Sequence, residues 1–245
     1  KTACMRATAD FIAISDQDDI WMPEKIEKQV NAIGDYNICF SAHTRGKKME
    51  TAHIVSPRCS LEALLFADIA GHTMLVRRDL VQREEIWMDK IYYDWCIVIN
   101  SYFYGEKAII KIDEPLNWHR SHEDEAAFKQ NKELFPDSNT KPTYQPYLYG
   151  LRNYRNLQSK PNWILFYSFI RDHADASRYP LQHRMAELML SDSLLSLLKL
   201  CWLCMKHREN IYPSPNKTKG IRGMIRGFFY PFIFSYRCSY FDLKR

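Results

Sequence analysis

Three aspartates lie within four residues near the start of the chain, at Asp16, Asp18 and Asp19. They directly follow residues 10–15, a hydrophobic segment typical of a short buried strand. Carboxylates held this close repel one another, and a divalent cation removes the conflict. Mg²⁺ and Mn²⁺ prefer oxygen ligands and commonly bind one or two carboxylates together with substrate phosphates. The residues alone leave open a second interpretation, an acidic turn in which Asp19 caps the next helix.

The elements around this cluster alternate between short strands and helices. Residues 24–33 are predicted to form a helix, because Ile26, Val30 and Ile33 recur at helical spacing. Further strands are expected at 37–42, 71–77 and 108–112, with Asp113-Glu114-Pro115 closing the last one, and further helices at 60–65, near Leu80 and at 94–104. This alternation predicts an α/β layer architecture, in which ligands bind beyond the carboxyl ends of strands. The acidic cluster occupies such a position.

The segment from Ser15 to Ile26, SDQDDIWMPEKI, resembles the DxD region of family 2 glycosyltransferases, in particular the rhamnosyltransferase-like branch. The resemblance implies a GT-A-like (Rossmann-like) α/β domain that uses Mg²⁺ or Mn²⁺. It also implies roles for the three aspartates. Asp16 would contact the nucleotide ribose or a water on the metal, Asp18 would bind the metal directly, and Asp19 would assist.

Two later segments resemble the same family. Tyr93-Asp94-Trp95 is similar to the acidic motif before a helix, which implies that Asp94 is the catalytic base. An inverting transfer needs one carboxylate to take the acceptor hydroxyl proton, whereas the metal stabilises the departing diphosphate. The segment from Gly71 to Arg78 is similar to the acceptor side, where Gly71, Thr73 and Trp95 are implied. A helix cap at Asp94 and a core strand at 71–78 remain the alternatives.

The segment Asp113–His122 resembles the family's strand followed by a Tyr-Arg-x-His element. Arg120 would pair with a phosphate through its fork of donors, and His122 would be a further metal ligand or phosphate contact. Trp118-His119 stands where the pattern usually has an aromatic residue before the arginine. The alternative is a pair of surface residues on a loop after a strand.

The resemblance covers about residues 8–125. We therefore expect a catalytic domain at 1–125, a linker at 126–147 and a mostly helical extension at 148–245. Only 15 residues precede Asp16, whereas the family's fold opens with a strand, a helix and a strand that form the base pocket. The expectation is an N-terminally incomplete domain that binds nucleotide-sugar poorly by itself.

The C-terminal half shows its strongest helical pattern at residues 181–205. One broad apolar face of this segment is expected to pack on the catalytic domain or a neighbouring helix. Its residues are Leu188, Leu194, Leu195, Leu198, Trp202 and Met205. The tail from Lys217 combines lysines and arginines with an aromatic block at residues 228–234. That composition suits either an interfacial segment attracted to anionic lipid or an aromatic-rich packing segment.

Composition sets broad limits. The 245 residues, 46% of them hydrophobic, are enough for a sizeable core, and the net charge is only +5. The seven scattered cysteines indicate reduced thiols in a cytoplasmic protein, with Cys201 and Cys204 packing as small hydrophobes. No apolar run approaches the roughly 20 residues that span a bilayer, so any membrane contact is expected to be peripheral, at the inner face of the plasma membrane. The cations form no nucleic-acid motif.

The sequence therefore predicts inverting transfer of a sugar, with rhamnose as one candidate. The donor is a nucleoside diphosphate-sugar, and the acceptor is a glycan or a lipid-linked molecule in surface polysaccharide synthesis. Two rivals stay open. One is a metal-dependent phosphotransferase or hydrolase, although the chain offers no P-loop for it. The other is an inactive fragment or a non-catalytic interaction module.

Overall fold

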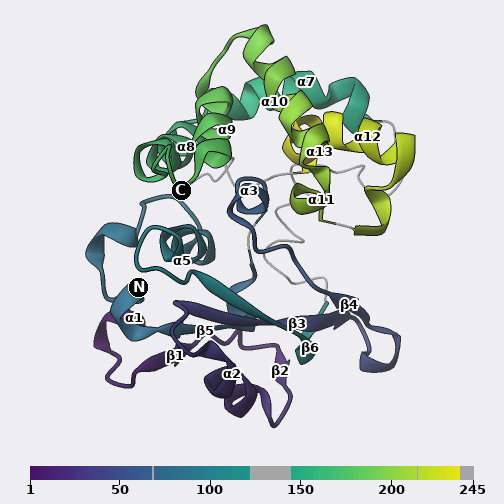
Figure 1. Ribbon diagram of the computed structural model, residues 1–245. Coiled ribbons are helices and arrows are strands. Elements are labelled where there is room, and N and C mark those ends of the chain that lie inside the picture. The colour runs from purple at the N-terminus through teal and green to yellow at the C-terminus, as the bar shows by residue number, and fades with distance from the viewer. Residues whose placement is uncertain (68, 122–144, 214, 238–245) are drawn as a thin grey trace. The chain divides into compact units, whose positions relative to one another are not determined.

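The computed structural model describes residues 1–67, 69–121, 145–213 and 215–237 (Figure 1). The chain divides into two compact units. The first comprises residues 1–59 and 68–125, and the second comprises residues 60–67 and 126–245. The short segment 60–67 thus joins the second unit, although it lies within the range expected for the catalytic domain. Residues 122–144, which include most of the expected linker, lie outside the described residues.

The first unit contains a mixed six-stranded sheet. Its strands are β1 (Phe11–Ala13), β2 (Ile20–Trp21), β3 (Ile38–Gly46), β4 (His53–Val55), β5 (Met74–Arg77) and β6 (Ile109–Arg120). They are ordered β1-β5-β3-β6-β2, with β4 paired to β3. The β3–β6 pair is parallel and the other pairs are antiparallel. The strands β1 and β2, close together in sequence, therefore lie at opposite ends of this order.

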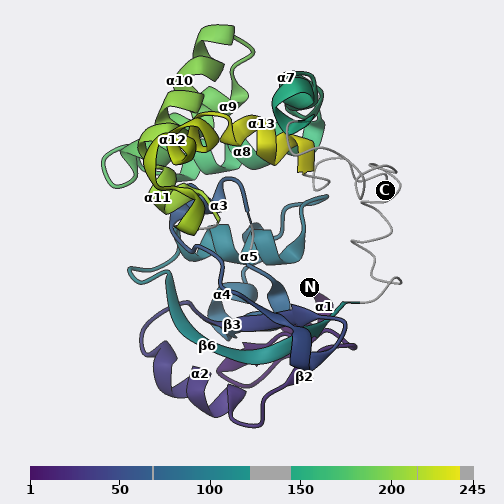
Figure 2. The same ribbon diagram turned by 90° about the vertical axis from the view of Figure 1, so that its right-hand side faces the viewer.

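Helices cover both faces of the sheet. Those of the first unit are α1 (Thr2–Arg6), α2 (Lys25–Ile33), α4 (Arg78–Val81) and α5 (Tyr93–Ser101), with 3-10 turns η1 (Met49–Thr51), η2 (Gly71–Thr73) and η3 (Glu84–Ile86). Helix α2 lies on one face and α5 on the other (Figures 1 and 2). On the α2 side, Ile33 packs with Cys39 and Leu75 of the sheet. This layering confirms the predicted α/β architecture.

The last strand differs from its prediction. We expected it to close at Asp113-Glu114-Pro115, but β6 continues to Arg120. Its register with β3 shifts, because Ser41 pairs with Ile112 and Ala42 already pairs with Pro115. This bulge lets the exposed residues 113 and 114 loop out, and a bulge tolerates a proline that cannot donate a hydrogen bond. His119 and Arg120 consequently lie on the strand, so Arg120 is not on a loop after it, whereas His122 lies outside the described residues.

The predicted strand at 71–77 begins later than expected. Residues Gly71–Thr73 form the turn η2, and β5 starts at Met74. The Thr73 hydroxyl donates a 2.7 Å hydrogen bond to the Ala70 carbonyl oxygen, which closes the turn. Because of this turn, His72 precedes the regular strand.

The second unit is helical. Its elements are α3 (Leu61–Leu64), α7 (Gln145–Gln158), α8 (Pro161–His173), α9 (Pro180–Leu190), α10 (Leu194–Lys206), α11 (Arg208–Ile211), η4 (Pro215–Lys217), α12 (Gly220–Phe228) and α13 (Tyr230–Arg237). Trp163 is fully buried, and its indole N–H donates to the Met189 carbonyl oxygen at 2.9 Å. From the aromatic block, Tyr230 and Phe234 are buried against Phe66. These buried aromatic residues therefore build the core of this unit.

The apolar face predicted for the C-terminal half is wrong in part. The helix expected at 181–205 breaks at residues 191–193, which resets the helical phase. Leu188 and the α10 residues Leu197, Leu200, Cys201 and Cys204 are buried, whereas Leu194, Leu195, Leu198 and Trp202 are exposed. Burial raises the pKa of the Cys201 thiol to about 12. None of the helices in the described ranges has the length and apolar character to span a bilayer.

Candidate active site

The acidic residues lie on the loop between β1 and β2. Strand β1 pairs with β5 at one edge, and Ile20 and Trp21 of β2 pair with β6 at the other. The loop therefore runs across the end of the sheet, past β5, β3 and β6. Side chains near the ends of those three strands can meet the aspartates, although they are far away in sequence.

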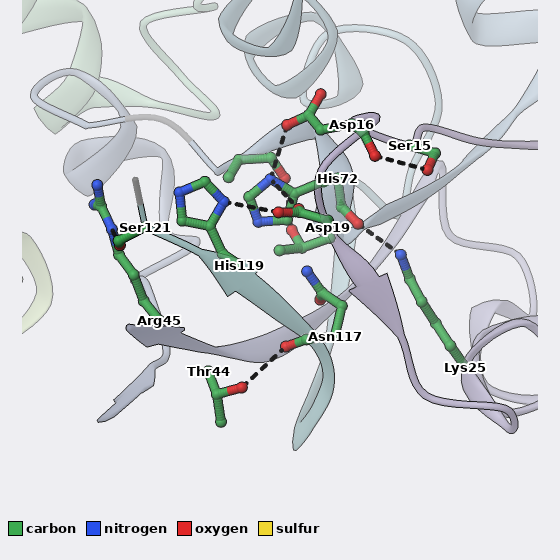
Figure 3. Close-up of polar contacts among 12 residues, drawn as sticks. Ser15, Asp16, Asp19, Lys25, Thr44, Arg45, His72, Asn117, His119 and Ser121 are labelled. Atoms are coloured by element: carbon green, nitrogen blue, oxygen red, sulfur yellow. Dashed lines mark hydrogen bonds and ion pairs between the residues drawn. The ribbon is translucent and has the colours of Figure 1, made fainter. Parts of the chain in front are cut away.

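Two histidines meet the acidic loop (Figure 3). His72 Nδ1 lies 3.2 Å from Asp16 Oδ2 and also 3.2 Å from Asp19 Oδ2. His119 Nδ1 lies 2.9 Å from Asp19 Oδ1. The Asp19 side chain has no exposed surface, and that of His72 is only 5% exposed. Asp19 is thus a buried carboxylate between two imidazoles.

A third histidine completes the cluster from β3. The rings of His72 and His119 are stacked, with centroids 5.0 Å apart, and His43 meets both edge-on. Burial, together with the neighbouring His72 and His119, lowers the pKa of His43 to about 3. His43 is therefore neutral across the physiological range and adds no charge to the cluster.

Helix α2 holds the turn that carries His72. Lys25 is fully buried, and its Nζ donates to the His72 carbonyl oxygen at 2.6 Å while lying 3.9 Å from the centroid of the Trp21 ring. One turn later, Gln29 Nε2 donates to the Thr73 carbonyl oxygen at 2.7 Å. Burial lowers the pKa of Lys25 to about 8, although Asp19 and Asp16 act in the opposite direction. The helix after the acidic motif thereby fixes the position of the first histidine.

The cluster fits a divalent metal. Asp19, His72 and His119 each offer one ligand atom, and these atoms lie within 4.8 Å of one another. Within the described part of the chain, His72 Nε2 is buried without a hydrogen-bond partner, and the buried Asp19 Oδ2 has the 3.2 Å contact with His72 Nδ1 but no hydrogen bond. Leaving a buried polar atom without a hydrogen bond costs about 1–3 kcal/mol of folding free energy, which a bound cation would offset. Carboxylate and imidazole ligands together suit Mn²⁺ and other transition metals, whereas Mg²⁺ prefers oxygen alone.

Only some of the residues predicted to bind metal or nucleotide come together in the structure. It brings Asp16 and Asp19 together with His72 and His119. Asp18 is half-buried and stands outside that group of ligand atoms. Arg120 is exposed at the end of β6, and His122 lies outside the described residues.

Sequence reasoning missed His72, His119 and Lys25. Each lies within a segment that carried the family resemblance. The available signals were the place of His72 in the segment Gly71–Arg78 and the position of His119 directly before Arg120.

Asp94 lies in the first turn of α5. The helix begins at Tyr93 and its N-cap is Tyr92, so the cap predicted for Asp94 is wrong. The half-buried Asp94 side chain accepts a 2.9 Å hydrogen bond from the Trp95 backbone N–H. Tyr93 packs directly on Gly71, where an added Cβ would lie 2.7 Å from Tyr93 Cε2. The residue before Asp94 therefore touches the residue before His72, which brings the base segment to the cluster.

The three residues predicted on the acceptor side are buried in the structure. Gly71 and Thr73 lie in the buried turn η2, and Trp95 is 1% exposed. This placement favours a supporting function for Thr73 and Trp95 behind the site. Their contact with an acceptor stays a prediction.

The model of glycosyl transferase family 2 matches residues 1–99. This match supports a family 2 glycosyltransferase. The matched range contains the acidic loop, His72 and Asp94, and it ends before the strand that carries His119. No curated protein matches the chain. With the mixed sheet and the helical C-terminal part, the family 2 match fits an α/β GT-A-like fold.

Proposed function

We propose that the first unit transfers a sugar from a nucleoside diphosphate-sugar to an acceptor hydroxyl. One observation carries the proposal. Asp19 lies in the range that matches family 2, and its fully buried carboxylate contacts the imidazoles of His72 and His119, in a cluster where His72 Nε2 has no hydrogen-bond partner. A buried polar cluster of this kind is costly unless it has a ligand.

The metal would be held by Asp19, His72 and His119. The donor set favours Mn²⁺ over Mg²⁺, because two of the three ligands are imidazoles. Once bound, the cation supplies positive charge that stabilises the departing diphosphate. Asp18 and His122 remain proposed further ligands on the family resemblance, as does Asp16 toward the ribose and Arg120 toward a phosphate.

Asp94 is proposed as the base. The acceptor hydroxyl gives its proton to the Asp94 carboxylate while its oxygen bonds to the anomeric carbon. The bond from that carbon to the diphosphate breaks, and the configuration inverts. The Trp95 N–H orients the carboxylate in the first turn of α5. We further propose rhamnose as one candidate sugar and a glycan or lipid-linked acceptor in surface polysaccharide synthesis.

Acceptor-dependent release of nucleoside diphosphate tests this function. The purified chain is supplied with Mn²⁺, a panel of nucleoside diphosphate-sugars and polysaccharide or lipid-linked acceptors. We expect release to require both metal and acceptor. Phosphate release without an acceptor would indicate a hydrolase or phosphotransferase. Metal binding without any turnover across the panel would indicate a non-catalytic module.

A further inference from the structure

We propose that the second unit docks on an anionic membrane surface through the outward side of α10 and α12. We call this surface the α10–α12 face, and its central residues are Leu195, Leu198, Trp202, Ile221, Met224 and Ile225. It is distinct from the catalytic cluster and does not depend on sugar transfer.

Helix α12 buries its small residues and exposes its large apolar ones, which is the reverse of an ordinary amphipathic helix. Its buried side is Gly223 and Gly227, whereas Ile221 is 77% exposed, Ile225 50% and Met224 42%. An added Cβ on Gly227 would lie 3.0 Å from Met205 Cα, so this glycine lets the α12 backbone lie directly on the end of α10. The large apolar side chains therefore do not contribute to the core, and a helix of this kind is typical of an apolar interface.

Helix α10 extends the same apolar surface. Leu195, Leu198 and Trp202 are three and four residues apart, which places them in one stripe on the exposed side. The helices α10 and α12 pack against each other. Where they meet, a hollow of about 310 Å³ is lined by Met205, Ile221, Met224, Ile225, Phe228 and Phe229. Met205 lies three residues after Trp202 on α10, so it continues the α10 stripe to this hollow and connects it with the exposed side of α12.

The charges around this surface decide what kind of partner it fits. From Ser193 to Arg237 the sequence carries eight lysines or arginines and a single acidic residue, Glu209. Among side chains that the structure describes, the ion pairs of the second unit involve Arg171, His183 and Arg184, and none involves the seven of these cations that precede Arg237. An apolar centre with a basic border matches the acyl boundary and anionic headgroups of a lipid surface.

The positions of individual cations and of Trp202 also fit an anionic lipid surface. Arg222 and Arg226 directly follow Ile221 and Ile225 in α12, so cations flank the apolar stripe. Lys206 Nζ lies 5.3 Å from the centroid of the Trp202 ring. Tryptophan is enriched where a membrane meets water, because its ring is apolar and its N–H is polar. The contact surface is therefore this helix pair, and not the buried aromatic residues Tyr230 and Phe234.

Vesicle co-sedimentation of the full chain tests the proposal. Vesicles of phosphatidylcholine with phosphatidylglycerol are compared with vesicles of phosphatidylcholine alone. We expect at least about tenfold tighter binding to the anionic vesicles, weakened by added salt. Trp202 fluorescence should shift to shorter wavelength on binding, and the Trp202→Phe variant should lose that shift.

A matched pair of triple variants isolates the face. Ile221→Ser/Met224→Ser/Ile225→Ser should lose most vesicle binding. The control, Leu148→Ser/Ile164→Ser/Leu165→Ser, replaces residues of the same unit that are 67%, 49% and 42% exposed but lie on α7 and α8. It should bind vesicles like the unchanged protein. Circular dichroism checks that both variants fold.

Three results would overturn the proposal. The first is equal vesicle binding by the two triple variants. The second is equal binding to neutral and anionic vesicles. The third is dimerisation of the chain through this face. The last would appear in size-exclusion chromatography as a dimer that the α12 variant dissociates, without any vesicle binding.

Discussion

The two units break the ordinary distribution of side chains in opposite directions. The first buries polar groups, since Asp19, His72 and Lys25 are enclosed at the end of the sheet. The second exposes apolar groups, since Trp202 and Ile221 lie in the open. A buried charge and an exposed apolar patch each cost free energy unless something binds there. The two departures are therefore offset by different ligands in the two proposals, a cation in the first unit and a lipid surface in the second.

The largest expected effect tests the chemistry beside the buried cluster. Asp94→Asn keeps the size of the side chain but removes the base, so transfer should fall by about 10²–10⁴-fold. Mn²⁺ affinity, measured by calorimetry, should stay unchanged because Asp94 is not a ligand. A loss of metal binding in this variant would instead place Asp94 in the metal centre.

Burial itself is tested by two tryptophans of the second unit. Trp163→Ala should lower the free energy of unfolding by about 3–5 kcal/mol, because the ring is fully buried and its N–H is bonded. Trp202→Ala, at 50% exposure, should change it by no more than about 0.5 kcal/mol. Chemical denaturation measures both values. A large loss for Trp202→Ala would show that the α10–α12 face belongs to the folded core.

A pair of neighbouring aspartates tests which carboxylate binds the metal. Asp19→Asn should weaken Mn²⁺ binding by at least about 100-fold, because it removes the charge of a direct ligand and loss of an outer-shell partner alone costs about 10- to 100-fold. The sequence resemblance assigned the direct contact to Asp18, so Asp18→Asn is the informative comparison. Asp10→Asn, whose side chain is 85% exposed, serves as the control. A greater loss in Asp18→Asn than in Asp19→Asn would favour the sequence-based assignment.

A smaller effect is expected where the exposed face is anchored. Gly227→Ala places a Cβ against Met205 and Arg208, so α12 must move away from α10. Overpacking of this kind costs about 1–3 kcal/mol in the free energy of unfolding. Vesicle binding should weaken in parallel, because the two helices no longer present one surface. Full stability in this variant would contradict the close docking of α12.

The sequence by itself determined the elements that depend on local pattern. The acidic loop after a short strand, helix α2 with its periodic isoleucines and valine, and the alternation of strands and helices all follow from spacing and residue type. The position of Asp94 at the start of a helix was also readable. These features need only neighbouring residues, so no knowledge of the partner strands is required.

Only the tertiary structure decided which side chains meet. Asp19 and His119 are 100 residues apart, and they come together because the acidic loop crosses the sheet from β1 to β2. The bulge that carries β6 past Pro115 arises from its register with β3. Likewise, the break before α10 and the glycines of α12 decide which apolar residues are buried. Strand order, register and helix phase are set by packing between distant segments, and local pattern does not encode them.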